Sequence, residues 1–563
     1  MLLGESNTKG GSESDFMTIQ NMKQTEFKEA TLAEWEQVAI KSLKGKSLES
    51  LSTKTLEEVI LKPLYSLADM EEVSIHQTNT IRSAKKTADW LIAQQATGNT
   101  SEEVLMDIQD SLAKGNNIIH YTLENHHEWD KAQLEEFSSL VEQHPVLLDV
   151  SVDPTFIHNF KTIKGAVKGA ENINMPNTRS VFLDGTSIHQ AGGDAVSELV
   201  SVLVQADNLT QNNSIEKMTQ KAFVQFSVDT NFFMEIAKIR AFRVLWKAFG
   251  EAHGQENIEA IPVHTETSLR SFSALDATVN ILRAANSTLA AVLGGADSVT
   301  SYPHDILTST NPTSKRIARN MQLVLKEETH IQRVIDASGG SYYIETLTKQ
   351  LVEKAWALFL ELIKEKASAE AKLNERAAAK WEEQLEALAT RKKSLIGTNV
   401  YANPDDSLLF ILNETGYKRL AEPFEQLRQA FLSNSLKTAI FPYGLLKEYK
   451  ARMDFVSGYL TSIGLTATVA PENLKPFDLQ KWIDDNEIDY GVFVGNDEQS
   501  AGLVPALLNE KPSIPLDVAG KLEEYEDWLE AGLNGRIFAG QSLFEKGFEL
   551  LALAKKEDSN DNA

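Results

Sequence analysis

Two stretches of sequence decide the fold: residues 183–193 (LDGTSIHQAGG) and residues 267–305 (TSLRSFSALDATVNILRAANSTLAAVLGGADSVTSYPHD). The first follows a short apolar run at 180–183 and leads into a helix that begins at Asp194. The second predicts a polar strand end, a helix over 276–293, a break at Gly294-Gly295 and a strand over 298–301. In a barrel of parallel strands, ligand-contacting residues lie at the carboxyl ends of the strands and on the loops that follow. Both stretches therefore place polar residues where substrate chemistry would occur.

The same alternation of short apolar runs and amphipathic helices extends from about residue 67 to residue 359. Strands separated by helical patterns are typical of βα units and a parallel sheet. Seven candidate strands can be named, at 117–122, 146–152, 180–183, 222–226, 261–265, 298–301 and 334–335. Eight such units closing into a (β/α)8 TIM-type barrel is the most economical arrangement for this length.

A second alternating region begins near Leu436. Its predicted strands lie at 438–441, 467–469, 490–494, 513–516 and 536–538, and its predicted helices at 447–463, 479–485, 501–509, 522–531 and 543–554. Five short strands alternating with five helices are typical of a flavodoxin-like, doubly wound domain. The predicted fold class is therefore α/β, with a TIM-type barrel followed by a flavodoxin-like domain.

The segments outside these two regions complete the predicted domain organisation. Residues 1–24 are rich in Gly, Ser, Thr and Asn and predict a mobile tail. Residues 25–66 form an N-terminal arm with a helix at 32–41, and the charged, Ala-rich stretch 351–393 is helical throughout. The domains are the tail (1–24), the arm (25–66), the barrel (67–360), a helical linker (361–435) and the flavodoxin-like domain (436–563).

Composition excludes several classes of function. The 563 residues contain no cysteine, which rules out disulfides and thiolate metal sites and suits a reducing compartment. A net charge of −25 argues against nucleic acid and anionic membrane surfaces as partners. The N-terminus lacks the basic and apolar regions of a signal peptide, and no run approaches the roughly 18 apolar residues of a transmembrane helix. We therefore expect a cytoplasmic protein.

Several strings in a fixed order resemble the methylmalonyl-CoA mutase family, whose adenosylcobalamin-dependent enzymes interconvert methylmalonyl-CoA and succinyl-CoA. Beyond the two opening stretches, the resemblance is carried by residues 231–246 (NFFMEIAKIRAFRVLW), 316–322 (RIARNMQ), 334–348 (VIDASGGSYYIETLT) and 395–401 (LIGTNVY). It covers roughly residues 180–400. The family combines a barrel with a C-terminal cobalamin-binding domain, which agrees with the predicted fold.

The departures from the family pattern fall on its reacting residues. Catalytic chains carry Gly-Tyr-His-Met-Gln-Glu-Ala-Gly where this chain has residues 185–192 (GTSIHQAG), so Ser187 stands at the position of the catalytic His. In the family's segment that touches coenzyme A, an Arg and a Gln are replaced here by Pro262 and Glu266. These changes remove a phosphate donor and add repulsion toward an anionic cofactor. A further family Arg falls on Lys221.

The cobalamin motif of the family is also replaced. Catalytic chains carry Asp-x-His-x-x-Gly after the first strand of the C-terminal domain, and its His coordinates cobalt while its Asp fixes the imidazole tautomer. The aligned positions here are Lys447, Tyr449 and Arg452, and residues 436–563 contain no histidine. Cobalt ligation by a histidine of this domain is therefore excluded, whereas base-on binding without a protein ligand stays open. We interpret the domain as a degenerate cobalamin-binding fold.

The chain therefore resembles the small, noncatalytic subunits of heterodimeric methylmalonyl-CoA mutases, an isomerase complex of propionate metabolism. The resemblance implies a large catalytic subunit as partner, adenosylcobalamin bound only by that partner, and an arm that embraces it. A homodimer is possible when the chain is alone. No catalytic, cofactor-binding or metal residue is predicted, and the candidates for a vestigial pocket are Ser187, His189, Gln190, Lys221, His264 and Glu266.

Two other classes of function remain open. One is an autonomous barrel isomerase or hydrolase that uses His189, Gln190 and His264. The other is a regulatory binding module of the mutase. A metal site at His126-His127-Glu128 is disfavoured, because consecutive side chains diverge and no second His is placed one helical turn away.

Overall fold

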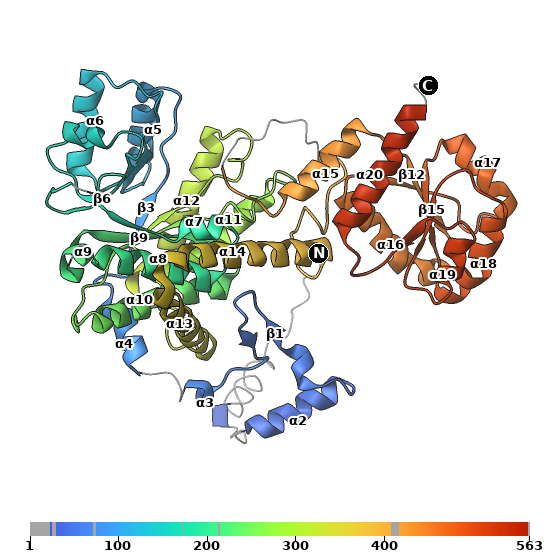
Figure 1. Ribbon diagram of the computed structural model, residues 1–563, viewed down its shortest axis with the longest axis horizontal. Coiled ribbons are helices and arrows are strands. Elements are labelled where there is room, and N and C mark those ends of the chain that lie inside the picture. Colours follow the sequence, from blue (N-terminus) through green and yellow to red (C-terminus); the bar gives the residue numbers. More distant parts are fainter. Residues whose placement is uncertain are drawn as a thin grey trace, which may run out of the picture. The chain divides into compact units, whose positions relative to one another are not determined.

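The computed structural model describes residues 23–24, 30–70, 75–171, 173–211, 214–406 and 416–560 (Figure 1). Most of the predicted tail, and residues 25–29 of the predicted arm, lie outside these described residues. The chain divides after Tyr65 into two compact units. In the described part, no helix is long and apolar enough to cross a membrane.

The first unit is small and carries helix α2 (Leu32–Ser42), close to the helix predicted at 32–41. Thr31 caps α2 through a capping box with Glu34, which satisfies backbone donors at the start of the helix. A single helical turn, η1 (Leu48–Leu51), and an antiparallel pair, β1 (Thr53–Lys54) with β2 (Ile60–Leu61), complete it. No residue of α2 is buried, so the apolar side chains of Leu32, Val38 and Ile40 remain exposed.

Parallel strands form two sheets in the first half of the second unit. Among the described residues, one sheet has the order β3-β11-β10-β9-β8 and the other the order β4-β5-β6-β7, with every pair parallel. An isolated bridge between Gln95 and His120 connects the ends of β3 and β4. The strands are β3 (Leu91–Ala93), β4 (Ile119–Thr122), β5 (Val146–Asp149), β6 (Gly165–Lys168), β7 (Thr178–Arg179), β8 (Val181–Asp184), β9 (Ala222–Val228), β10 (Val263–Thr267) and β11 (Ser298–Thr300).

The predicted strands agree with this arrangement except in four places. Residues 334–335, predicted as a strand, lie in an exposed turn, because Asp336 adopts a left-handed conformation and its carbonyl oxygen accepts from the N–H of Gly339. Strands β3, β6 and the short β7 were not predicted. The described strands pair as an α/β structure with two parallel sheets, and their pairing does not form a closed ring.

Helices connect the strands, and local sequence explains where they begin and end. Asp194 caps α8 (Ala195–Thr210) by accepting from the N–H of Ser197, as the predicted start at Asp194 requires. Helix α11 (Val279–Gly294) ends at Gly295, whose φ of 90° is readily adopted only by glycine. The short helix α7 (Thr186–Gln190) occupies the loop after β8.

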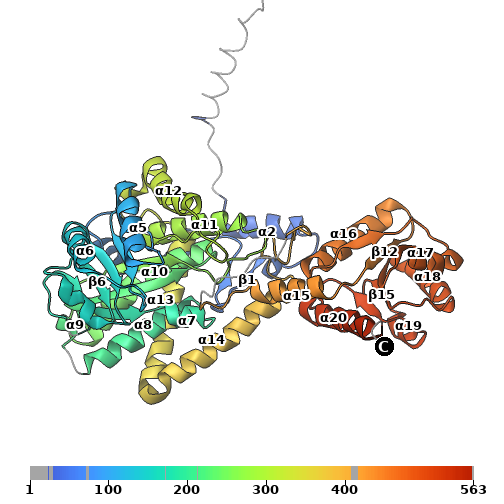
Figure 2. The same cartoon turned by 90° about the horizontal axis from the view of Figure 1, so that it is seen from above.

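The remaining helices of this half are amphipathic or largely buried. Helix α10 (Phe232–Ala252) is buried on nearly all sides. Helix α14 (Lys366–Ala389) is largely polar, and Figure 2 shows its length. A single turn, η4 (Ile363–Glu365), separates α13 from α14, so the stretch predicted as continuous helix is interrupted there. The other helical elements are α3 (Leu67–Met70), α4 (Ile75–Ser83), α5 (Ser101–Ala113), α6 (Lys131–Gln143), η2 (Pro154–Asn159), α9 (Ile215–Lys221), α12 (Pro312–Thr329), η3 (Ile331–Arg333) and α13 (Tyr342–Leu362).

The C-terminal region contains a parallel sheet with the order β13-β12-β14-β15-β16. Its strands are β12 (Thr438–Pro442), β13 (Ala467–Val469), β14 (Tyr490–Val494), β15 (Leu516–Ala519) and β16 (Gly535–Ile537). Its helices are α15 (Glu422–Ser433), α16 (Leu446–Ser462), α17 (Pro476–Asn486), α18 (Asp497–Asn509), α19 (Tyr525–Glu530) and α20 (Leu543–Asn560). The strand predicted at 513–516 is displaced toward the C-terminus.

Alternate side chains of this sheet enter different hydrophobic cores. Ile440 and Val492 pack with α16 and α20, whereas Phe441 and Phe493 pack with α17, α18 and α19. The helices accordingly lie on both faces of the sheet (Figure 1). Two covered faces explain why these strands are apolar throughout instead of alternating with polar residues.

Candidate functional site

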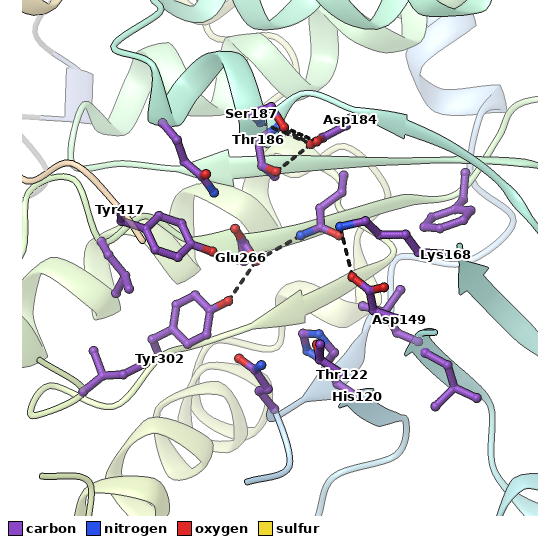
Figure 3. Close-up of a pocket in the computed structure, with 18 of the residues that line it drawn as sticks. His120, Thr122, Asp149, Lys168, Asp184, Thr186, Ser187, Glu266, Tyr302 and Tyr417 are labelled. Atoms are coloured by element: carbon purple, nitrogen blue, oxygen red, sulfur yellow. Dashed lines mark hydrogen bonds and ion pairs between the residues drawn. The ribbon is translucent and has the colours of Figure 1, made fainter. Parts of the chain in front are cut away.

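A polar cavity of about 490 Å³ lies at the carboxyl ends of the strands in the two N-terminal sheets (Figure 3). Strands β4, β5, β6, β8, β9 and β10 each contribute at least one lining residue, and the segments after β3 and β11 contribute others. Parallel α/β sheets bind ligands at this end of their strands. The principal polar lining residues are Gln95, His120, Thr122, Asp149, Lys168, Asp184, Ser187, Gln190, Gln225, Glu266, Tyr302 and Tyr417.

Asp184, at the end of β8, organises the loop that carries Ser187. One oxygen of Asp184 accepts from the Thr186 N–H at 2.8 Å, from the Thr186 hydroxyl at 2.5 Å and from the Ser187 N–H at 3.3 Å. The Ser187 hydroxyl donates to the other oxygen of the same carboxylate. Ser187 is therefore held against Asp184, and its hydroxyl proton is already engaged (Figure 3).

The second carboxylate of the cavity belongs to Asp149 and is paired with the amine of Lys168. The two groups lie 3.0 Å apart, and the hydroxyl and N–H of Ser151 donate to the other carboxylate oxygen. The Lys168 amine also lies over the ring of Phe182. The lysine that lines the cavity is thus already committed to an ion pair.

Glu266 is the most deeply buried carboxylate of the cavity. It accepts from the Gln225 amide at 3.0 Å, from the Tyr302 hydroxyl at 2.9 Å and from Ser227 at 3.4 Å. All three donors are neutral, so the carboxylate has hydrogen bonds but no ion pair among the described residues. Burial raises the pKa of Glu266 to about 7, an effect that Tyr302 partly opposes and that the negative charge of Asp184 reinforces.

His120, which lines the cavity, is linked through Thr300 to a second histidine, His264, which does not. His120 Nδ1 is 2.9 Å from the Thr300 hydroxyl, which is 3.3 Å from His264 Nε2. Burial lowers the pKa of His120 to about 4, so this imidazole is neutral near neutral pH. His264 Nδ1 contacts Ser298, and the His264 ring lines a separate, mostly apolar cavity of about 220 Å³.

His189 belongs to a buried network behind the cavity. Its Nε2 lies 2.7 Å from the Ser268 hydroxyl and its Nδ1 lies 2.8 Å from Glu198. This geometry resembles a Ser-His-carboxylate triad, but Ser268 is only 5% exposed and does not line the cavity. A substrate would have no access to that hydroxyl, so the network is structural.

Lys238 supplies the positive charge of this network. Its amine lies 2.8 Å from Glu198, 2.6 Å from Glu235 and 2.7 Å from the carbonyl oxygen of Ser227. Burial opposes the charge on Lys238, but Glu198 and Glu235 outweigh it and raise the lysine pKa. Burial raises the pKa of Glu198 to about 7, and that of Glu235 is also raised.

The six residues predicted as pocket candidates are found in different places. Ser187, Gln190 and Glu266 line the polar cavity together. His189 and His264 point into the networks just described, and neither reaches the cavity. Lys221 lines an open groove with Arg179 and donates to the carbonyl oxygen of Met175. The residues proposed for an autonomous enzyme, His189, Gln190 and His264, therefore do not converge on one cavity.

Sequence reasoning missed most of the cavity lining. His120, Asp149, Lys168 and Asp184 lie within or at the ends of β4, β5, β6 and β8, and Tyr302 follows β11. Asp184 directly follows the predicted strand 180–183, whereas Asp149 lies inside the predicted strand 146–152, which ends three residues earlier in the structure. No sequence signal connects Tyr417, far along the chain, to this cavity.

A set of three possible metal ligands, Glu124, His126 and His127, lies near the cavity rim, with ligand atoms within 4.8 Å of one another. Both ring nitrogens of His127 already have partners, namely the Tyr121 hydroxyl at 2.8 Å and the Gly98 carbonyl oxygen at 3.0 Å. Glu124 lies 3.3 Å from His126. Because His127 is committed to internal hydrogen bonds, this set does not form a metal site.

Lys447, Tyr449 and Arg452, which align with the cobalamin motif, have different surroundings at the carboxyl edge of the C-terminal sheet. Tyr449 is buried and donates its hydroxyl proton to Glu472. Arg452 donates to the carbonyl oxygens of Gly495 at 2.7 Å and Ala519 at 3.4 Å, and pairs with Asp497. Lys447 is exposed. Arg452 thus makes internal contacts at the ends of β14 and β15, and Tyr449 contacts the segment after β13, at the edge where a doubly wound sheet would bind a ligand.

The fold is therefore that of an α/β protein. Two parallel sheets with a polar cavity at their carboxyl ends are followed by a C-terminal region with a third parallel sheet. The chain belongs to the methylmalonyl-CoA mutase family, whose model matches residues 160–440. The match includes β8, β9 and β10 with their loops and extends into the first strand of the C-terminal sheet.

Curated relatives are named as subunits of the mutase. The chain is 28% identical to the methylmalonyl-CoA mutase small subunit of Porphyromonas gingivalis, over 78% of this chain and 83% of that protein. It is 32% identical to a probable small subunit of Mycobacterium bovis, over 51% of this chain and 50% of that protein. The large subunit of Porphyromonas gingivalis is 30% identical over 53% of this chain and 44% of its own length. The matched region thus spans about half the length of the last two relatives.

Among solved structures, a dihydropteroate synthase from Thermus thermophilus is similar over 44% of this chain and 98% of its own. The TM-score is 0.26 and the identity 14%, values too low to assign a fold.

Proposed function

We propose that this chain is the noncatalytic structural subunit of a heterodimeric, adenosylcobalamin-dependent methylmalonyl-CoA mutase. In this proposal the partner large subunit binds coenzyme and substrate and carries out the isomerisation. The observation that carries the proposal is the state of Ser187, which stands at the catalytic His position and is held by Asp184. A serine in that contact offers no imidazole for the substrate.

The coenzyme A positions support the same conclusion. Glu266 replaces a Gln and lies in the cavity as a buried carboxylate, hydrogen-bonded to Tyr302 and Gln225. Ionised, it would repel an anionic thioester. Pro262 replaces an Arg and provides no phosphate donor.

We further propose that the two N-terminal sheets belong to one (β/α)8 barrel. Pairing of the first strand, β3, with the last, β11, supports this arrangement, as does the Gln95–His120 bridge between β3 and β4. The C-terminal sheet is proposed to be flavodoxin-like, because its strand order corresponds to 2-1-3-4-5 in chain order.

The proposal includes the expectation that this chain binds no adenosylcobalamin. Tyr449 and Arg452 already make internal contacts at the sheet edge, and neither phenol nor guanidinium can replace an imidazole ligand. Purified chain titrated with adenosylcobalamin at micromolar concentration should give no saturable change in absorbance. The large subunit, titrated in parallel, should give one. Stoichiometric uptake by this chain would refute this part of the proposal.

The proposed heterodimer interface includes the N-terminal arm. Its exposed apolar side chains, among them Leu32, Val38 and Ile60, have no cover within the first unit. Stable heterodimers commonly bury more than about 2,000 Å². That relatives of this chain include both a small and a large subunit of one organism supports a partner of the same family.

Activity and association together test the function. This chain alone should form no succinyl-CoA above background, whereas its mixture with the large subunit should be active. Deleting residues 1–62 should leave the rest folded by circular dichroism but strongly reduce co-purification with the large subunit. Deleting residues 1–24 is the matched control and should leave association unchanged.

Each contrary result has a distinct meaning. Turnover by the chain alone would favour an autonomous enzyme. A large subunit that is equally stable and active alone, with its rate merely adjusted by this chain, would favour a regulatory module. If the shortened chain still co-elutes with the large subunit at nanomolar concentration, the arm is not the contact. Failure of the full chain to associate would overturn the subunit proposal itself.

A further inference from the structure

Four carboxylates line the polar cavity: Asp149 is paired with Lys168, Glu124 lies 3.3 Å from His126, and Asp184 and Glu266 have no positive partner among the described residues. Asp184 and Glu266 accept hydrogen bonds only from neutral groups, and neither forms an ion pair in the described part of the chain. Asp149, by contrast, is neutralised by Lys168. Carboxylates withdrawn from water are stable when a cation accompanies them, which leaves a deficit of positive charge in this cavity.

A neutral imidazole with a free ring nitrogen opens into the same cavity. His120 is nine-tenths buried, and its Nδ1 is occupied by Thr300. Its Nε2 makes no hydrogen bond within the described residues, and the side chain lines the cavity beside Thr122 (Figure 3). Because the cavity leaves this nitrogen accessible, a ligand there can exchange a hydrogen bond with it.

The spacing of these groups argues against a metal ion. Asp149, Asp184 and Glu266 do not bring three ligand atoms within 4.8 Å of one another. The cavity of about 490 Å³ is also far larger than one ion needs. Separated carboxylates in a cavity of this size suit an organic cation whose charged ends are joined by a short chain.

We propose that this cavity binds a small organic amine, with ammonium groups directed to Asp184 and Glu266 and a polar atom hydrogen-bonded to His120. The site is independent of the proposed mutase partnership, since it requires only this chain. It reverses the charge preference expected of a site for acidic thioesters. The ammonium groups of the ligand would supply the positive charge that the residues around Asp184 and Glu266 lack.

Binding should strengthen as pH rises. The groups that face Glu266 are Tyr302, Tyr417, Asp184 and Lys168, and burial raises the pKa of Glu266 to about 7. An ammonium group competes with the proton on Glu266, so affinity follows the ionised fraction of this carboxyl. Between about pH 6 and about pH 8 that fraction rises roughly tenfold, and the affinity should rise by the same factor.

Calorimetric titration of the full chain with three four-carbon probes tests the proposal. Putrescine, the diamine, should bind at one site with at least millimolar affinity at about pH 8 and roughly tenfold more weakly at about pH 6. Butanediol, its neutral isostere, and succinate, its dianionic counterpart, should not bind. Equal binding of butanediol, preference for succinate or absence of putrescine binding would each overturn the proposal.

Two variants locate the site. Glu266→Gln should weaken putrescine binding about tenfold at about pH 8 and abolish its pH dependence. Glu251→Gln, a change at an exposed position on α10, should leave the putrescine affinity and its pH dependence unchanged. If Glu266→Gln fails to fold, the pH dependence of the unaltered chain still decides, because pH-independent binding would contradict the assignment to Glu266.

Discussion

Replacing Lys238 by Met is expected to reduce the free energy of unfolding by about 3–5 kcal/mol. The lysine is fully buried and lies between Glu198 and Glu235, and no other lysine or arginine pairs with either carboxylate among the described residues. Burial lowers the pKa of His189 well below its usual value, so this imidazole does not supply a charge to Glu198. Removing the amine leaves two buried carboxylates without compensation. The change in unfolding free energy can be measured from urea unfolding followed by circular dichroism.

The same helix offers a matched control. Lys247 on α10 pairs with Glu251 one turn away at 3.4 Å, but the pair is partly exposed. Because solvent screens such pairs, Lys247→Met should change the unfolding free energy by less than about 1 kcal/mol. A similarly small effect of Lys238→Met would mean that the buried carboxylates become protonated at little cost.

Sequence patterns predicted the helix ends and strands that are determined by local interactions or by continuous apolar runs. The Asp194 cap and the left-handed Gly295 depend on interactions within a few residues, and the apolar runs of β9 and β14 mark strands that are buried on both faces. Strand β6 was missed because it begins with Gly165, which weakens a strand pattern. That glycine is required by packing, since a Cβ there would lie 2.2 Å from the Val146 carbonyl oxygen.

The wrong strand at 334–335 has a tertiary cause. Asp336 forms an ion pair with the buried Arg240, and the chain turns at Asp336 with a φ of 55°. Val334 and Ile335 are apolar and β-branched, so their local preference favours a strand. An ion pair to a residue nearly 100 positions earlier overrides that preference, and no local pattern contains it.

The cavity was predicted in outline but not in composition. Ser187, Gln190 and Glu266 line one cavity, because parallel strands bring their carboxyl ends together. The same argument failed to separate Gln190, which lines the cavity, from its neighbour His189, whose ring enters the buried network. Side-chain direction on α7 is set by contacts with Ser268 and Glu198, which are remote in sequence.

Glu266→Gln is expected to alter how stability depends on pH. The ordinary pKa of a glutamate is 4.5, and burial raises that of Glu266 to about 7 in the folded chain. Between these values the folded state retains a proton that the unfolded state releases. The free energy of unfolding therefore falls as pH rises from about 4.5 to about 7, and Glu266 alone accounts for about 3 kcal/mol of the decrease.

The variant removes that titration while it keeps an oxygen that can accept from Tyr302. Relative to the unaltered chain, Glu266→Gln should gain about 3 kcal/mol between about pH 4.5 and about pH 8, measured by urea unfolding at each pH. Glu198, whose pKa is also raised to about 7, remains in both proteins and cancels in the comparison. Parallel pH profiles for the two proteins would show that Glu266 is ionised without cost, and that the cavity already supplies the positive charge we infer it lacks.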